Sequence, residues 1–272
     1  MTEPNPPASD VRPPEPAPAP AAPMCLAARL LNVFAAPSEA FDDIKHKPVN
    51  HANWAVPATL IVIIGWFGAL LIFSQDNIKQ QLKEVSHKAI QKQFEKQHMS
   101  QEQMDKAMDT AEKYAGISQM VGAFFLPIFA GFLTPVVWGL IFWVIGAKIL
   151  GGGFEYMKAV EAVGLGNMIG VLGALVKTLL IVAMGNIFAA PTPMLLVKDW
   201  NPENHLHALL GYINILTFWV LAVRAIGISK LSNVSFMRAG LWVFGIWIGY
   251  SALFFGFGLA MQQVFSHMGG GK

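Results

Sequence analysis

The sequence predicts an all-α membrane protein with about five transmembrane helices. Long apolar stretches fill the chain between residues 54 and 265, and residues 116–147 contain no Asp, Glu, Lys or Arg. Of the 272 residues, 54% are hydrophobic and only 13% are charged, whereas globular domains average about 25% charged residues. Because a helix needs roughly 20 apolar residues to cross the ~30 Å hydrocarbon core, these stretches indicate that the chain lies in a bilayer.

The first 23 residues are predicted to form a disordered tail, because they are rich in proline and alanine and have little to bury. Residues 24–47 then predict two short amphipathic helices. Apolar side chains recur at helical spacing in the first helix, and Pro37 suits the first turn of the second. The segment is too short and too charged to span a bilayer, which indicates a position at the membrane interface.

Residues 24–265 are interpreted as one membrane domain. The expected spans are about residues 54–73, 117–149, 163–184, 206–228 and 239–261. The second would reach about 50 Å at ~1.5 Å per residue, which is too long for one perpendicular helix. It is either one tilted helix that continues the polar helix before it, or a helix broken at Pro127 or Pro135. A short charged segment, residues 154–162, leads into the third span.

A polar insertion, residues 75–115, separates the first two spans. It contains seven Lys and seven Asp or Glu residues, so its charge cancels. A narrow apolar stripe predicts two helices that break near His98 and Met99, and Ser100 with Gln103 fits a capping box for the second. The insertion is either a solvated spacer or a pair of helices that binds a partner or associates with itself.

Five spans place the two ends of the chain on opposite sides of the membrane. If the N-terminus is cytoplasmic, that side holds nine Lys and Arg residues, including all four arginines, while the third loop and the C-terminus hold two. The seven lysines of the insertion fall on the other side and offset this bias. The placement of the arginines favours a cytoplasmic N-terminus, in a bacterial cytoplasmic (inner) membrane.

Three segments resemble the Yip1-domain family of multi-span membrane proteins. Residues 31–48 (LNVFAAPSEAFDDIKHKP) are similar to the amphipathic segment before that family's first span. Residues 213–248 (INILTFWVLAVRAIGISKLSNVSFMRAGLWVFGIWI) are similar to its fourth and fifth helices, which carry tryptophans on both sides of a short basic loop. Residues 155–171 resemble the start of its third helix. The resemblance covers most of residues 26–265, without the proline tail and the polar insertion.

The resemblance implies a five-helix membrane bundle with a cytoplasmic N-terminus. Eukaryotic members are linked to vesicle traffic and to prenylated small GTPases, but the acidic-Leu-Tyr-Gly-Pro signature of those members is absent between the first two spans. The chain is similar to bacterial members, for which the resemblance implies a fold and no activity.

Lys177 is the candidate for an intramembrane polar site, because it is the one charged residue between Glu161 and Lys198. It either extends its ammonium group to the interface or lines a water-filled or lipid-headgroup site. Asn167 and Asn214 are expected to form hydrogen bonds across helices and, with Lys177, could outline a small polar cavity.

Small residues at four-residue spacing predict two helix-packing strips. One strip consists of Gly166, Gly170 and Ala174, and the other of Gly245 and Gly249. Such strips let helix backbones approach closely, here either within one subunit or between copies.

No sequence pattern indicates catalysis. There is no nucleophile–base set, no phosphate-binding glycine loop and no cluster of metal ligands, so no catalytic, cofactor or metal site is expected. The net charge of +2 gives no reason to expect nucleic acid binding, and the single cysteine, Cys25, excludes an internal disulfide. The leading hypothesis is a non-enzymatic membrane scaffold or trafficking-type protein, with a membrane-protein partner or a homo-oligomer. The alternative is a small transporter, channel or lipid-handling protein that uses Lys177.

Overall fold

A computed structural model describes residues 23–95, 101–197 and 204–268, and these residues form helices and loops without a strand. The elements are α1 (Leu26–Ala35), α2 (Pro37–Lys45), α3 (Ala52–Phe73), α4 (Asp76–Glu95), α5 (Gln101–Trp143), the π-helical turn η1 (Val144–Ile149), α6 (Tyr156–Gly166), α7 (Met168–Met184), the 3₁₀ turn η2 (Pro193–Leu196), α8 (His205–Tyr212), α9 (Ile215–Ser232) and α10 (Phe236–Met268). Within the described part of the chain, five helical segments are long and apolar enough to cross a membrane. The predicted all-α membrane fold is therefore confirmed.

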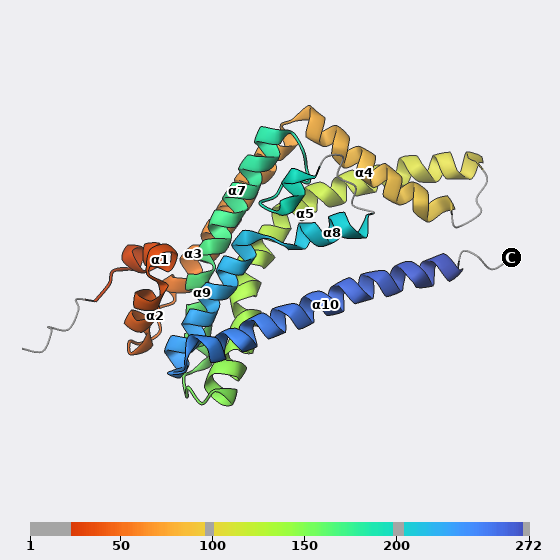
Figure 1. Cartoon of the computed structure of the whole chain (residues 1–272). Helices are drawn as coiled ribbons and strands as arrows, with labels where there is room; N and C mark the ends of the chain where they lie inside the picture. Colours follow the sequence, from red (N-terminus) through yellow and green to blue (C-terminus); the bar gives the residue numbers. More distant parts are fainter. Residues whose placement is uncertain (1–22, 96–100, 198–203, 269–272) are drawn as a thin grey trace, which may run out of the picture.

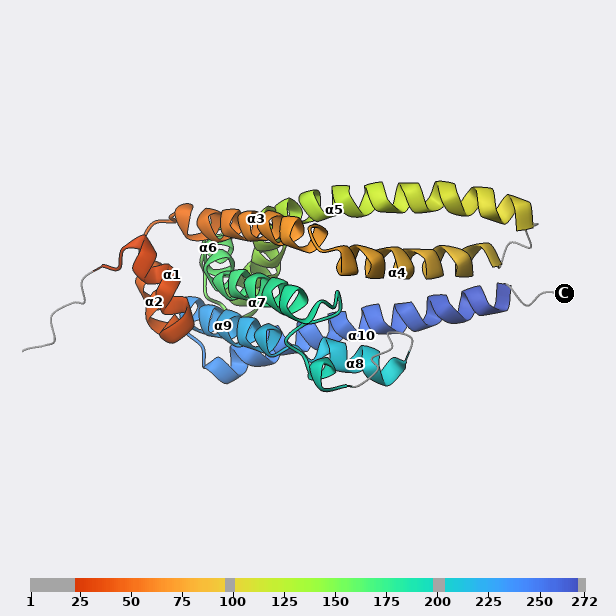
Figure 2. The ribbon, with the colours of Figure 1, turned by 90° about the horizontal axis from the view of Figure 1, so that it is seen from above.

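The bundle is built around α3, which packs against α5, α6 and α7, while α9 packs against α6, α7 and α10 (Figure 1). Helices α1 and α2 cover one end of this bundle. At the other end, α4 and the first half of α5 run side by side away from it, and α10 extends in the same direction (Figure 2). The N-terminal helices and the C-terminal end of α10 consequently lie at opposite ends of the molecule.

The two short helices predicted before the first span are present as α1 and α2, with Pro37 in the first turn of α2. Their apolar faces are buried on the bundle through Val33, Phe41 and Ile44. Phe41 fits on α9 because Gly227 has no side chain, and a Cβ at that position would lie 3.1 Å from the ring. The amphipathic pattern thus serves to attach α1 and α2 to the ends of α6, α7 and α9.

The polar insertion forms α4 and the first part of α5. The second span was expected to be either one continuous helix or a helix broken at a proline. The structure shows the continuous helix: α5 runs without a break from Gln101 to Trp143, with Pro127 and Pro135 inside it. The predicted break near His98 and Met99, and the capping residue Ser100, lie outside the described residues.

The charged segment that was predicted to lead into the third span, residues 154–162, is helical from Tyr156 onward and belongs to the span itself. Helices α6 and α7 together form this span, which is interrupted at Asn167. Lys158 and Glu161 are both buried in α6. The two side chains form an ion pair at 2.5 Å, so α6 buries no unbalanced charge at this point.

The fourth span, predicted over residues 206–228, also needs correction. Helix α8 ends at Tyr212, the backbone is extended at Asn214, and α9 begins at Ile215. The side chain of Asn214 accepts a hydrogen bond from the Leu216 amide at 2.9 Å, so it caps α9. The membrane-crossing helix is therefore α9 alone, and α8 is a separate short helix.

Candidate functional site: buried charges in the bundle and at its α1–α2 end

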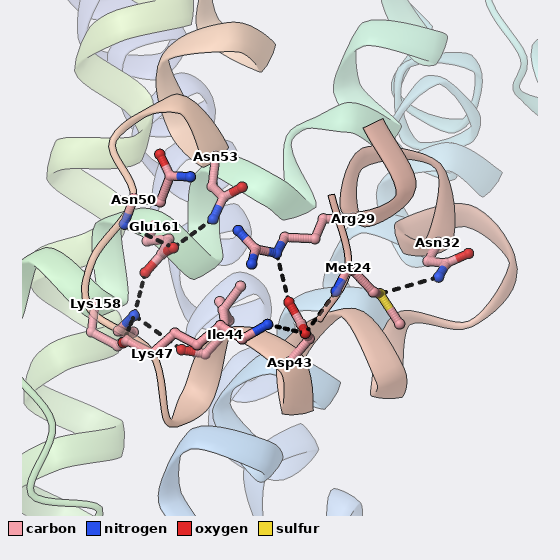
Figure 3. A network of polar contacts seen from close by, with 10 residues as sticks. All are labelled: Met24, Arg29, Asn32, Asp43, Ile44, Lys47, Asn50, Asn53, Lys158 and Glu161. Atoms are coloured by element: carbon pink, nitrogen blue, oxygen red, sulfur yellow. Dashed lines mark hydrogen bonds and ion pairs between the residues drawn. The ribbon is translucent and has the colours of Figure 1, made fainter. Parts of the chain in front are cut away.

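The first cluster of charges joins α1 to α2 around Asp43 (Figure 3). Arg29 Nε donates to Asp43 Oδ2 at 2.6 Å, the Met24 amide donates to Oδ1 at 3.1 Å, and Lys47 Nζ also donates to Oδ1. Burial alone would raise the pKa of Asp43, but these hydrogen bonds, with that from Lys47 the strongest, lower the pKa below its ordinary value. Asp43 therefore remains ionised and holds α1 and the segment before α3 together.

Lys158 is the centre of the second cluster, on α6. Its ammonium group donates to Glu161 Oε2 at 2.5 Å, to the Ile44 carbonyl at 3.0 Å and to the Lys47 carbonyl at 2.9 Å. An ammonium group has three N–H donors, and each of them has an acceptor here. Lys158 is thus fully engaged with the C-terminal end of α2 and the segment that follows it.

Glu161 continues this cluster toward α3. Its other oxygen, Oε1, accepts from Asn53 Nδ2 at 2.5 Å and from the Asn50 amide at 3.2 Å (Figure 3). Only 1% of Glu161 and 7% of Lys158 is exposed. A pair so deeply buried is stable when its remaining donors and acceptors are satisfied, which is largely the case here. The arrangement fastens the α2–α3 connection to α6.

A third buried charge lies deeper in the bundle, on α9. Arg224 is 8% exposed, its Nη2 donates to Asn167 Oδ1 at 3.1 Å, and its guanidinium carbon lies 4.9 Å from the centre of the Trp138 ring. The Asn167 side chain is thereby held between the α6–α7 junction and α9, which is the cross-helix bond expected of it. The expectation for Asn214 is wrong, because that side chain caps α9.

Lys177 is exposed on the surface of α7, seven residues before the end of that helix. Among the described residues, neither Asn167 nor Asn214 is a hydrogen-bond partner of Lys177, so the predicted polar cavity is not assembled from these three side chains. At ~1.5 Å per residue the helix end is about 10 Å away, a distance that fits an ammonium group extending toward the interface.

A groove with a volume of about 770 Å³ lies between α3, α5 and α7, and Leu82 of α4 contributes to its wall. Its wall is mainly apolar, with Gln119 and Thr178 among the few polar residues, and Lys177 does not line it. Within the described residues, no group of three His, Cys, Asp or Glu side chains could hold a metal ion.

Comparison with known proteins identifies the family. A model of the Yip1 domain matches residues 31–259, which is most of the chain. The chain belongs to the Yip1-domain family. Searches of curated proteins and of solved structures found no match. Family membership and five apolar helices together make this a multi-pass membrane protein.

The close helix contacts of this Yip1 domain involve other glycines than the sequence suggested. Around Gly170, Gly245 and Gly249 there is nothing within 4 Å of where a Cβ would stand, so these residues do not mediate close packing within the described chain. Gly166 makes only ordinary contacts, with Arg224 and Val223 at 3.7 and 3.8 Å.

The close approaches lie on α3, α5 and α6 instead. A Cβ at Gly164 would stand 2.1 Å from Trp54 Cβ, and one at Gly131 would stand 2.5 Å from the Ala58 carbonyl oxygen. Ala174, the remaining member of the first predicted strip, lines the groove between α3, α5 and α7.

Sequence reasoning also missed the buried charges of this Yip1 domain. Arg224 was counted with the loop charges that set orientation, although it lies in the middle of α9. The sequence does mark this residue, because Arg224 is the one Lys or Arg between Lys198 and Lys230. The Lys158–Glu161 pair could be suspected from its spacing of three residues, which places both side chains on one face of a helix.

Proposed function

We propose that this Yip1-domain protein is a non-enzymatic scaffold of a bacterial cytoplasmic membrane, and that it binds a membrane-protein partner through α4 and the first part of α5. The observation that carries the proposal is the continuity of α5 from Gln101 to Trp143. A polar pair of helices is in this way attached rigidly to the transmembrane bundle. A rigid surface outside the bilayer loses little conformational entropy when it binds.

The pair of polar helices is held together by contacts between its two members. His87 Nδ1 on α4 is hydrogen-bonded to Glu112 on α5, and Gln119 Nε2 donates to Ser86 Oγ at 2.5 Å. The outer faces of both helices remain exposed, with charges of both signs. A surface of this kind suits a polar protein partner, whose charged residues it can match in either sign.

The buried charges of the bundle support a scaffold over an enzyme. Lys158 and Glu161 are engaged with each other and with the α2–α3 connection, which holds the bundle closed at this end. The three N–H donors of Lys158 and both carboxylate oxygens of Glu161 already have partners within the bundle. The absence of an enzymatic activity remains part of the proposal.

Crosslinking in the native membrane, followed by mass spectrometry, tests the scaffold role. The lysines of the polar helices serve as handles, among them Lys79, Lys88 and Lys113. Lys148 on η1, beyond the other end of α5, is the internal control. Reproducible crosslinks from the polar helices to one defined protein support the proposal and name the partner. Crosslinks confined to the chain itself or to its own copies contradict it.

The cytoplasmic position of the N-terminus is part of the same proposal, and Cys25 allows a direct test. It is the single cysteine of the chain and is exposed just before α1. A membrane-impermeant maleimide should label it only after the membrane is permeabilised. The matched control, Cys25→Ser combined with Lys88→Cys, should be labelled on intact spheroplasts. Labelling of Cys25 on intact spheroplasts, without labelling at position 88 in the control, would show that the N-terminus lies outside the cytoplasm.

A lipid-handling role is the second candidate function. The groove between α3, α5 and α7 favours this role, because an apolar groove that is open along membrane-spanning helices fits an acyl chain. Lys177 does not line this groove. A transfer assay with fluorescent phospholipids between vesicles tests the role, and Ala174→Phe, which adds bulk to a residue lining the groove, should abolish any transfer observed.

A further inference from the structure

The groove between α3, α5 and α7 is as long as one leaflet of a bilayer is deep. On α3 its lining runs from Ile61, near the middle of the helix, to Phe73 at its end, and on α5 it runs from Ala130 back to Ser118. Each side covers 12 residue steps, which at ~1.5 Å per residue amounts to about 18 Å. Half of the ~30 Å hydrocarbon core is about 15 Å. The groove therefore extends from the membrane surface on the α4 side to about the middle of the bilayer.

Small side chains create this space. Helices α5 and α7 both pack on α3 but are not a closely packed pair themselves. A Cβ at Gly65 would stand 2.6 Å from Pro127 on α5, and one at Gly68 would stand 2.7 Å from Thr178 Oγ1 on α7, so α3 forms the floor of the groove. Glycine and alanine supply 7 of the 16 lining residues, among them Ala174. The volume of about 770 Å³ lies within the range of ~300–1,000 Å³ that is usual for ligand sites.

The wall of the groove suits an uncharged, apolar chain. None of the described residues that line it is Asp, Glu, Lys, Arg or His. Two of its polar side chains, Ser118 and Gln119, lie at the α4 end, where the groove reaches the membrane surface. Gln119 donates to Ser86 on α4, whereas the exposed Ser118 hydroxyl has no partner within the described chain. A hydrogen-bond donor is thus available where a lipid chain would meet its polar end.

We propose that the groove holds one acyl chain of a phospholipid from the leaflet on the α4 side, as a resident ligand. The ester carbonyl of the chain accepts from the Ser118 hydroxyl, and the phosphate stays in the headgroup layer beyond the groove. A free fatty acid fits less well, because its carboxylate would meet no cation among the lining residues. The inference rests on the lipid-handling candidate, since it concerns the same groove. It requires no transfer activity and is independent of the scaffold role.

Native mass spectrometry of the full-length protein, released from its own membrane in a mild uncharged detergent, tests the site. A population of the wild-type protein should carry the added mass of one phospholipid. Ala174→Phe fills the groove and should lose this mass. Ala183→Phe should keep it and is the matched control, because Ala183 lies about two and a half turns further along α7, is exposed and does not line the groove. Equal retention in the wild-type protein and a folded Ala174→Phe would overturn the proposal.

A photoactivatable phosphatidylethanolamine, with a diazirine on one acyl chain, provides a test without any variant should Ala174→Phe not fold. In nanodiscs, adducts on the wild-type protein should gather on the lining residues of α3 and α5 and be rare at Leu253, on the exposed face of α10. Adducts as frequent at Leu253 as in the groove would overturn the site.

The identity of the retained molecule separates the remaining outcomes. A detergent, a free fatty acid or an isoprenoid in place of a phospholipid would overturn the ligand assignment. A bound phospholipid without transfer between vesicles would support the resident site and contradict the lipid-transfer role. Loss of the bound lipid in Ala174→Phe with unchanged crosslinks from the polar helices would support the site and show that it is separate from the scaffold surface.

Discussion

Lys158 Nζ and Glu161 Oε2 lie 2.5 Å apart on consecutive turns of α6, in the buried interior of the bundle. Both groups reach beyond their own helix. Lys158 donates to the carbonyls of Ile44, near the end of α2, and of Lys47, just after it. Glu161 accepts from Asn53 at the start of α3. One ion pair on α6 therefore fixes the direction in which the chain leaves the amphipathic helices and enters the first span.

Removing one member of this pair should destabilise the protein strongly. Glu161→Ala leaves the Lys158 ammonium buried without its carboxylate, and losses of about 3–5 kcal/mol are typical of such broken pairs. Thermal unfolding in detergent would show a large decrease in the unfolding temperature. The double variant Lys158→Met, Glu161→Leu should recover much of the loss, because no charge is then buried. A double variant as unstable as Glu161→Ala would mean that the backbone contacts of Lys158, and not the ion pair, carry the stability.

The contact between α1 and α2 should weaken in acid. The pKa of Asp43 is lowered in the folded protein by Lys47, Arg29 and the Met24 amide, so its contribution to stability is present above the ordinary Asp pKa and is lost as the pH falls through the lowered value. The difference in stability between the wild-type protein and Asp43→Asn should therefore shrink from pH 7 toward strongly acidic pH. Hydrogen exchange of α1 and α2 provides a local measurement. A difference that stays constant with pH would exclude this role of Asp43.

A single added methyl group should distinguish the glycines that pack from those that do not. Gly164→Ala places a Cβ 2.1 Å from Trp54 Cβ and forces α3 and α6 apart, at a cost of about 1–3 kcal/mol. Gly245→Ala meets nothing within 4 Å and should leave the unfolding temperature unchanged. If Gly245→Ala instead reduced the amount of an oligomer in native gels, the strip on α10 would be a seam between copies.

Replacing Lys177 should have little effect. The side chain is exposed on α7 and lines neither the large groove nor a charged cluster. Lys177→Met should fold with an unchanged or slightly higher unfolding temperature, because a charge is removed from a membrane-spanning helix. It should also retain the crosslinks of the polar helices. Loss of a transport or lipid-transfer activity with normal folding would show that Lys177 belongs to a functional site.

The helical class and the two amphipathic helices follow from local patterns, because periodicity and hydropathy act within a few turns of a helix. Local patterns left open whether the second span is continuous, since Pro127 and Pro135 could have broken it and do not. The buried charges do not follow from local patterns. Lys158 finds its acceptors at Ile44 and Lys47, more than 100 residues earlier in the chain, and no local pattern shows that distant carbonyls will be available.

Contacts between distant residues also explain why the predicted packing strips and the predicted limits of the fourth span differ from the structure. Small residues at four-residue spacing mark a smooth helix face but do not say what faces it. Gly245 and Gly249 form such a strip and meet no neighbour among the described residues, whereas Gly164, which is in no such strip, packs closely on Trp54. The break before α9 depends on one capping side chain, Asn214, in a stretch whose hydropathy is otherwise continuous.

The measurement that most directly tests the scaffold role is site-specific photo-crosslinking in living cells. A photoreactive residue at Lys88, on the exposed face of α4, is compared with one at Leu253, an exposed apolar position on α10. We expect Lys88 to give a crosslink to one defined protein and Leu253 to give no crosslink to that protein. If Lys88 crosslinks only within its own chain or to its own copies, the account of α4 and the first part of α5 as a partner-binding surface is contradicted.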